Sequence, residues 1–229
     1  MRKHSLFACL AIAGTLPSVA RAHHGLDFIL VQTAHLPEKG SGYVFGRVNR
    51  LEGDESETEI EPGALWGVTN RVALETHAHF AKATGESFGY EAVAGAAHFL
   101  LSPLSRELSY GMSVEYEVGS GHHGDDFLVS GVVGYEHKLW AAAANLLYER
   151  AEGSSAEWGY AGGIRRNLTS KHAIGVELQG TFEEHGNSEV LVAYYGQLRE
   201  KFWINAGIGK RIDEGPDHAA HLSFIYRFK

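Results

Sequence analysis

The chain has almost no cysteine. Its one cysteine, Cys9, lies in a stretch with the form of a secretory signal, among 229 residues in all. We therefore expect the mature protein to contain neither a thiol nor a disulfide, although it enters an oxidising compartment. A small domain held together by disulfides is excluded, because the remaining chain is long enough for one large domain without them.

Long apolar runs and an excess of positive charge are also missing. Beyond residue 22 no apolar run approaches eighteen residues, which excludes a membrane-spanning helix. The formal net charge is −8, and this argues against nucleic acid as a partner. Proline is scarce, with 5 residues, whereas glycine is abundant, with 28.

The N-terminus has the three parts of a cleavable signal peptide. Arg2 and Lys3 are the charged part, Leu6 to Leu16 is a short apolar stretch, and Ala20-Arg21-Ala22 is a cleavage signal. We expect residues 1–22 to be removed, 23–41 to form an N-terminal periplasmic segment, and 42–229 to form the main domain. A buried N-terminal helix of a soluble domain is the alternative.

The rest of the chain alternates with a period of two. In "LSYGMSVEYEV", residues 108–118, bulky apolar residues occupy every second position, and Glu115 and Glu117 lie between them. This pattern is typical of a strand with one apolar and one polar face. It recurs in twelve segments: 42–51, 57–68, 72–82, 87–101, 107–118, 126–136, 139–150, 156–167, 172–183, 188–198, 202–211 and 219–228.

The connections between these segments alternate in kind. Short ones, such as 68–71 and 168–171, carry basic residues, whereas longer ones, such as 119–126 and 151–157, are rich in glycine and acids. Short turns at one end and longer loops at the other are typical of bacterial outer-membrane barrels. We predict an all-β fold, a single up-and-down antiparallel transmembrane β-barrel of about 12 strands. A soluble β-sandwich is the alternative.

Each segment has an apolar face that suits the lipid outside a barrel and a polar face that suits its interior. Aromatic residues, among them Trp66, Trp140 and Trp158, lie near segment ends on the apolar faces, as interfacial girdles require. Phe228 is the penultimate residue, which resembles the C-terminal signature of such barrels, although Lys229 follows it. The polar faces should line the lumen, since a charge facing lipid costs several kcal/mol at mid-membrane depth.

Acidic residues dominate the predicted lumen. Its candidate binding residues are Arg47, Glu59, Glu61, Glu75, His77, His79, Glu91, Glu115, Glu117, Arg165 and Arg211. Two interpretations stay open for this wall. A structural network of Glu and Arg side chains would fill the barrel, whereas a partly open, acidic lumen would attract cations.

Three groups of histidines could bind a divalent transition metal, although no other cofactor is expected. His77 and His79 share a face with Glu75, and the expected cross-strand neighbours are Glu59 or Glu61 on one side and Glu91 on the other. His122 and His123 lie in an acidic loop, and His23 and His24 would begin the mature chain. A hydrogen-bonded cluster in the lumen is the alternative for the first group.

Residues 26–37, "LDFILVQTAHLP", precede the first segment and lack clean alternation. They could fold into the lumen as a plug or pack as a short helix beneath the barrel. A thirteenth strand is the alternative.

Three stretches resemble a known family: "YVFGRV", "GALWGVTNRVALETHAHF" and "GYAGGIRRNLTSKHAIGVELQG". They are similar to the outer-membrane barrels labelled meta-pathway phenol-degradation or outer-membrane transporter proteins. In that family a periplasmic turn carries the pattern matched here by Gly67, Val68, Thr69, Asn70, Arg71 and Glu75. The resemblance implies a passive outer-membrane channel for small molecules, with outer-membrane lipid and a solute as its partners.

A barrel enzyme and a metal-binding surface barrel are the rival functions. Outer-membrane phospholipases carry a His-x-Ser pair on the outer face, whereas this chain has His77-x-His79 on the predicted lumen face. Barrel proteases pair acids with histidine at the outer rim, and only Asp125 and Asp126 beside His122 and His123 approximate this. We therefore assign no catalytic residue.

Overall fold

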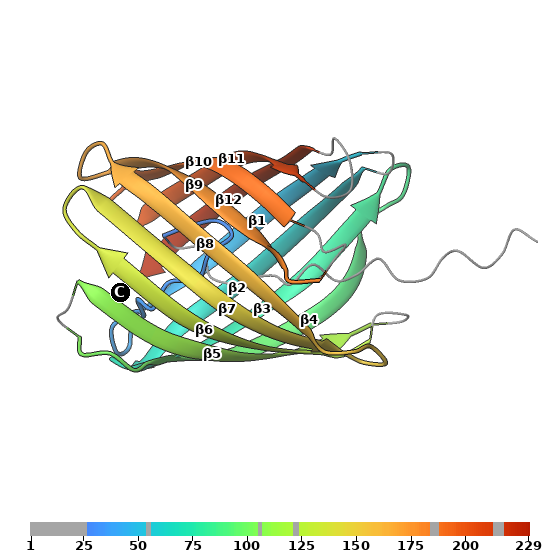
Figure 1. The fold of residues 1–229 in the computed structure, drawn as a ribbon, viewed down its shortest axis with the longest axis horizontal. Helices are drawn as coiled ribbons and strands as arrows, with labels where there is room; N and C mark the ends of the chain where they lie inside the picture. The colour runs from blue at the N-terminus through green and yellow to red at the C-terminus, as the bar shows by residue number, and fades with distance from the viewer. Residues whose placement is uncertain (1–26, 54–55, 105–106, 121–123, 184–187, 213–217) are drawn as a thin grey trace, which may run out of the picture.

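A computed structural model describes residues 27–53, 56–104, 107–120, 124–183, 188–212 and 218–229, which form a closed barrel (Figure 1). The twelve strands are β1 (Gly42–Glu52), β2 (Glu57–Thr69), β3 (Val72–Ala83), β4 (Gly89–Leu100), β5 (Leu108–Gly119), β6 (Asp126–Glu136), β7 (Trp140–Ala151), β8 (Glu157–Asn167), β9 (His172–Thr181), β10 (Ser188–Arg199), β11 (Phe202–Arg211) and β12 (His218–Phe228). No helix among these residues could cross a membrane.

Each strand pairs antiparallel with its neighbours in the chain, and β1 closes the sheet against β12. This last pairing runs from Gly42 opposite Phe228 to Glu52 opposite His218, so it uses the whole length of both strands. Closure leaves no strand edge with unpaired backbone groups. The predicted up-and-down barrel of twelve strands is confirmed, and the predicted segments coincide closely with the observed strands.

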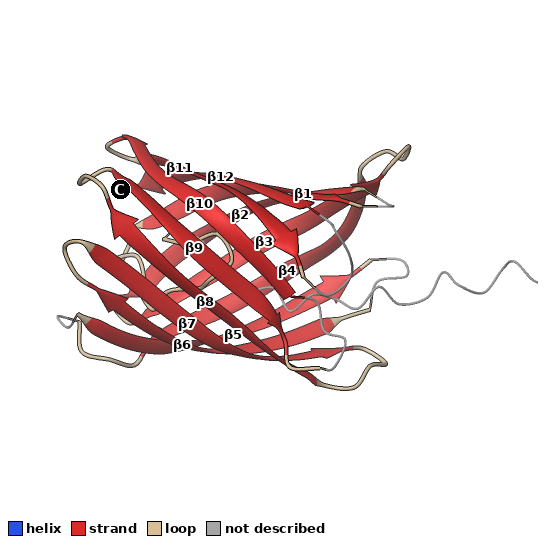
Figure 2. Cartoon of the chain, turned by 45° about the horizontal axis from the view of Figure 1, so that its top comes forward, coloured by secondary structure: helices blue, strands red, loops and turns tan. Residues whose placement is uncertain are grey.

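The outer surface is apolar over most of its height. Large apolar side chains on every strand are exposed, from Val44 on β1 through Val192 on β10 to Tyr226 on β12. Aromatic rings pair on this surface, with Tyr148 and Trp158 at 5.2 Å and Phe202 and Phe224 at 6.4 Å between ring centroids. Figure 2 shows the strands strongly tilted around this surface. A soluble sandwich is excluded, because an exposed apolar belt requires lipid.

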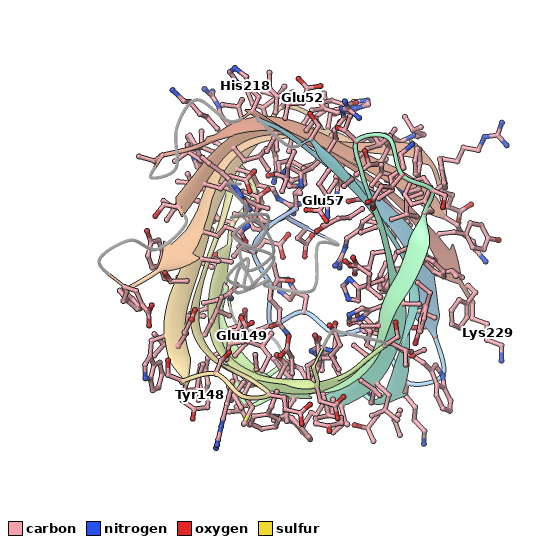
Figure 3. All side chains as sticks on the ribbon, turned by 90° about the vertical axis from the view of Figure 1, so that its right-hand side faces the viewer. Glu52, Glu57, Tyr148, Glu149, His218 and Lys229 are labelled. Atoms are coloured by element: carbon pink, nitrogen blue, oxygen red, sulfur yellow. The ribbon has the colours of Figure 1, made fainter. Side chains whose placement is uncertain are left out.

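Neighbouring residues on a strand face opposite sides of the wall. On β7, Tyr148 lies on the outer surface and Glu149 points into the barrel, as Figure 3 shows along the barrel axis. Glu149 is buried, as are many inward side chains of the other strands. The period of two in the sequence therefore sorts the side chains into lipid-facing and lumen-facing sets.

Residues 27–41 lie inside the barrel, toward the end that holds the C-terminus (Figure 1). They form neither a helix nor a strand. The segment leads into β1 at the end where the short turns lie. There Gly40 and Ser41 form backbone hydrogen bonds with Gly67 of β2. Phe28, Ile29, Leu30 and Val31 are buried in one apolar cluster with inward residues of β6 to β10. We refer to residues 27–37 as the inserted segment.

Candidate functional site

The lumen wall has two chemically different halves. Its mainly apolar half lies on β6 to β10, where Leu128, Leu147, Leu191 and several alanines pack with the inserted segment. The buried polar side chains of this half are Ser130, Asn145, Glu149, Glu177, Gln179 and Glu189. Its polar half lies on β1 to β5 and presents histidines, glutamates and an arginine. The buried polar residues of this half are Arg47, Glu59, Glu61, Glu75, His77, His79, His98, Ser109, Ser113 and Glu115.

A carboxylate on β9 anchors the inserted segment. Glu177 is fully buried and accepts hydrogen bonds from the backbone N–H groups of Ile29, Leu30 and Val31, the shortest at 2.6 Å from Leu30. The Tyr195 hydroxyl donates to the same carboxylate. A backbone without regular secondary structure must find other partners when it is buried, and Glu177 supplies them for three consecutive residues.

Gln32 connects the inserted segment with both halves of the wall. Its backbone N–H donates to Asn145 Oδ1 at 2.8 Å, and its carbonyl accepts from Asn145 Nδ2 at 2.9 Å. Its side chain lies 2.9 Å from His98 Nδ1 and accepts from Ser113 Oγ at 3.0 Å. Because Asn145 is on β7 whereas His98 and Ser113 are on β4 and β5, the segment crosses the lumen at this level.

An ion-pair cluster holds the beginning of the inserted segment. Arg165 on β8 donates to the Asp27 carbonyl at 2.7 Å and to its carboxylate at 3.1 Å. His35 lies between Asp27 and Glu136, 3.5 Å from each carboxylate. Burial alone would raise the pKa of Asp27, but Arg165 and His35 hold that pKa well below its ordinary value. The hydrogen bond to Asp27 raises the pKa of His35 above its ordinary value.

Histidines and glutamates alternate across the polar half of the wall. His77 Nδ1 lies 3.1 Å from Glu75 Oε1, and His98 Nε2 lies 3.3 Å from the other oxygen of the same carboxylate. His77 Nε2 is 3.8 Å from Glu115 Oε1. Nearer the long loops, His79 Nε2 lies 3.1 Å from Glu117 Oε2. We call these six residues, on β3, β4 and β5, the His–Glu cluster.

A second network continues around the wall toward β9. Arg47 donates to Glu61 at 2.7 Å, which joins β1 and β2. His221 on β12 lies 2.9 Å from Asn49 Oδ1 through one ring nitrogen and 2.7 Å from Glu189 Oε1 through the other. These contacts orient charged groups on the lumen face, where the surrounding barrel shields them from lipid.

Comparison with known proteins finds solved structures of the same fold. No family model and no curated protein matches the chain. An outer-membrane channel of the COG4313 type from Pseudomonas putida F1 superposes with a TM-score of 0.71 at 11% identity, covering 85% of this chain and 98% of that one. The KdgM porin gives 0.63 at 12% identity over 81% of this chain and 100% of its own. The NanC porin gives 0.60 at 8% identity, covering 80% and 98% respectively.

The fold is that of outer-membrane channels. Together with the apolar outer surface, it places the chain in an outer membrane. The predicted outer-membrane barrel and its location are thus confirmed. The narrower resemblance to the meta-pathway phenol-degradation type stays a prediction, since none of these structures tests it.

The structure brings most of the predicted lumen residues together on the inner wall. Arg47, Glu59, Glu61, Glu75, His77, His79 and Glu115 are buried there, and Glu117 and Arg165 are partly buried. Arg211 ends β11 and is partly buried. His23, His24, His122 and His123 lie outside the described residues. Asp125, which lies two residues after His123 in the sequence, accepts hydrogen bonds from the Tyr116 hydroxyl and the Gly119 backbone N–H.

On the β4 side, the residue opposite His79 differs from the prediction. The register between β3 and β4 shifts beside Glu91, and Ala92 instead occupies the inward position opposite His79. His79 contacts Glu117, two strands away, and on the other side the β2–β3 register, with Ile60 opposite Phe80 and Gly63 opposite His77, agrees with Glu61 as the neighbour of His79. A strand phase extrapolated from sequence cannot anticipate such a shift, because a bulge inserts one extra residue.

Sequence reasoning missed three residues that organise the lumen. His98 follows Ala92, Ala94 and Ala96 at every second position of β4. Counting in steps of two from Ala92 instead of Glu91 would have placed His98 on the lumen face. The alternation of β7 and β9 places Asn145 and Glu177 on the lumen face. No residue near them in the sequence indicates that they bind the inserted segment. Their role depends on a contact between residues more than a hundred positions apart.

Proposed function

We propose that the protein is a passive channel for small solutes, with a path along the acidic, histidine-containing wall of β1 to β5. The observation that carries the proposal is the division of the lumen. The inserted segment packs against the mainly apolar half, whereas contacts between histidines and glutamates continue along the polar half from Glu75 to Glu117. A barrel filled for stability alone is better served by apolar packing, because buried charges cost desolvation energy.

The solved channels of this fold support the proposal by analogy alone. The KdgM porin has also been solved in complex with disordered oligogalacturonate. Here the wall chemistry favours small cations or small polar molecules. Glu59, Glu61, Glu115 and Glu117 face the lumen on β2 and β5, and an acidic wall raises the local cation concentration.

The inserted segment narrows the lumen, and we assign it the role of a plug. It crosses between β7 and β4–β5 at Gln32 and is held on β9 by Glu177. Its attachment is polar at these points, so it can be weakened by a single substitution without altering the outer surface. Conductance should therefore depend on the residues that hold the segment.

Glu177→Gln provides the test. Glutamine offers one acceptor oxygen and turns an N–H donor toward the segment's own donors, so the bonds to residues 29–31 are weakened. Hydrogen bonds to charged groups contribute about 1.5–3 kcal/mol, and a loss of about 2 kcal/mol makes detachment roughly 30-fold more frequent. In planar bilayers with a KCl gradient and chelator, the parent should show a small cation-preferring conductance, and Glu177→Gln a larger one.

Glu189→Gln is the matched control, since Glu189 is also an inward carboxylate but bonds to His221 and Gln179 of the wall. It should leave the conductance near that of the parent. Heat-dependent gel migration verifies that each variant is folded. If neither the folded parent nor folded Glu177→Gln conducts, the lumen is a structural network and the channel proposal is wrong.

A further inference from the structure

We propose that His77, His79 and Glu117 form a binding site for a divalent transition metal ion on the lumen wall. One donor atom from each residue lies within 4.8 Å of the other two. Two imidazoles with one carboxylate suit Zn²⁺, Ni²⁺ or Cu²⁺, whereas Mg²⁺ and Ca²⁺ prefer oxygen alone. The site stands independently of whether the barrel conducts.

The donor atoms are close to the spacing that an ion requires. His79 Nε2 and Glu117 Oε2 are already 3.1 Å apart, and the rings of His77 and His79 lie 4.9 Å apart between centroids. Around a tetrahedral zinc ion with bonds of about 2.0–2.1 Å, donors are separated by about 3.3 Å. The donor atom of His77 lies within 4.8 Å of the other two, so the site needs to contract by about 1.5 Å to bind the ion.

The surroundings of His77 are those of a metal-binding histidine. Its Nδ1 lies 3.1 Å from Glu75, and its Nε2 points toward β5, 3.8 Å from Glu115 Oε1. A carboxylate on one ring nitrogen fixes the orientation of the ring and makes the other nitrogen a better ligand. Glu75 is itself held by His98, which lies 2.9 Å from Gln32 of the inserted segment.

Alanines on β4 make this arrangement possible. His77 pairs with Ala94, and Ala94 pairs with Glu117, so the two ligands are separated by a whole strand. Ala92 and Ala96 occupy the adjacent inward positions of β4 and are buried. Strands lie about 4.8 Å apart, and long side chains meet over an intervening strand only where its own side chains are small. The three alanines leave that space free.

A different histidine of the same wall shows what a simple ion pair looks like. His221 contacts Glu189 on one ring nitrogen and Asn49 on the other. Both nitrogens are engaged by wall residues, and this group does not belong to the metal-compatible set among the described residues. His221→Gln is therefore a control for the loss of a lumen histidine beside a carboxylate.

The test is calorimetric titration of the full mature protein, stripped with chelator in detergent, with ZnCl₂ and NiCl₂. The parent should bind one equivalent that disappears in His79→Gln and in Glu117→Gln but remains in His221→Gln. Glu75→Gln should weaken the same binding about 10–100-fold, the effect expected for a residue that orients a ligand. With Co²⁺, the parent and His221→Gln should develop the visible absorption of a low-symmetry nitrogen and oxygen site, whereas His79→Gln and Glu117→Gln should not.

Two further variants keep the outcome decisive. Ala94→Leu leaves every ligand in place but fills the space over β4, so it should abolish the same equivalent even if a histidine variant folds poorly. The double variant His122→Asn/His123→Asn removes the loop histidines and should retain it. The proposal is overturned if the parent binds no metal. It is also overturned if the bound equivalent disappears in the His122→Asn/His123→Asn variant but remains in folded His79→Gln.

Discussion

Individual lumen residues have separable tasks. Glu177 and Asn145 satisfy the backbone of the inserted segment, which has no regular secondary structure of its own. Arg47 neutralises Glu61 within the wall. The His–Glu cluster instead gathers ionisable side chains on three adjacent strands. These tasks depend on contacts between strands, which the sequence alone does not show.

His35 should make the attachment of the inserted segment depend on pH. The carboxylates of Asp27 and Glu136 face it, and Arg165 acts in the opposite sense from behind Asp27. Because its pKa is raised in the attached state, the stabilisation is complete below the ordinary value of 6.5 and is lost as pH rises through the raised value. Asp27 has a lowered pKa and stays ionised across this window.

We therefore expect the amides of residues 29–31 to be better protected from hydrogen exchange at about pH 6 than at about pH 9, after correction for intrinsic rates. His35→Gln should remove this difference while leaving the strand amides as protected as before. A His35→Gln protein that retains the full pH dependence would show that another group controls the segment.

At the scale of elements, small residues on the inward faces determine where the inserted segment lies. A side chain at Gly67 would begin 2.5 Å from the Pro37 carbonyl oxygen, and one at Gly163 would meet the Phe28 ring at 2.8 Å. Glycine at these two positions permits the close approach of the segment to β2 and β8. The space that small residues create is thus used by another part of the chain.

The outward faces of the strands should tolerate charge according to depth. Val192 is 59% exposed in the middle of β10, whereas Ile212, also 59% exposed, follows the end of β11. Val192→Lys should lower the free energy of unfolding by about 2–4 kcal/mol, but Ile212→Lys by about 0–1 kcal/mol, because the charge is costly only within the hydrocarbon. Equilibrium unfolding in lipid vesicles measures both. Equal costs would contradict the assigned membrane span.

At the scale of the whole molecule, the barrel has two unlike ends. At the end of the short turns β1 begins and β12 finishes, and there residues 38–41 connect the inserted segment to β1. The C-terminus lies at the same end. The longer connections, including the turn at Gly153 with φ of 78°, are at the other end. In bacterial barrels the short turns are periplasmic and the longer loops face outward.

An epitope inserted after Ser154, between β7 and β8, should accordingly be accessible to antibody on intact cells. The same epitope after Ser170, in the short turn between β8 and β9, should be accessible only after the outer membrane is permeabilised. Both sites are exposed and outside strands, so the two insertions are matched. Labelling of the Ser170 insertion alone on intact cells would invert the topology.

The sequence by itself determined the strands, their number and their two faces. Alternation in stretches such as residues 108–118 is a local property, since adjacent side chains on an extended chain point to opposite sides whatever the partner strand is. The lipid-facing set and most of the lumen-facing set follow from that period, because the membrane excludes charge. Alternating turn lengths then sufficed to predict an up-and-down barrel.

Only the tertiary structure decided which lumen residues meet. His79 contacts Glu117, two strands away, and not Glu91, because the β3–β4 register shifts and the alanines of β4 allow contact across a strand. The inserted segment was located by Glu177, 148 residues from Ile29 in the chain. Neither contact can be recognised from the neighbouring sequence, because these distant residues come within hydrogen-bonding distance only when the barrel closes.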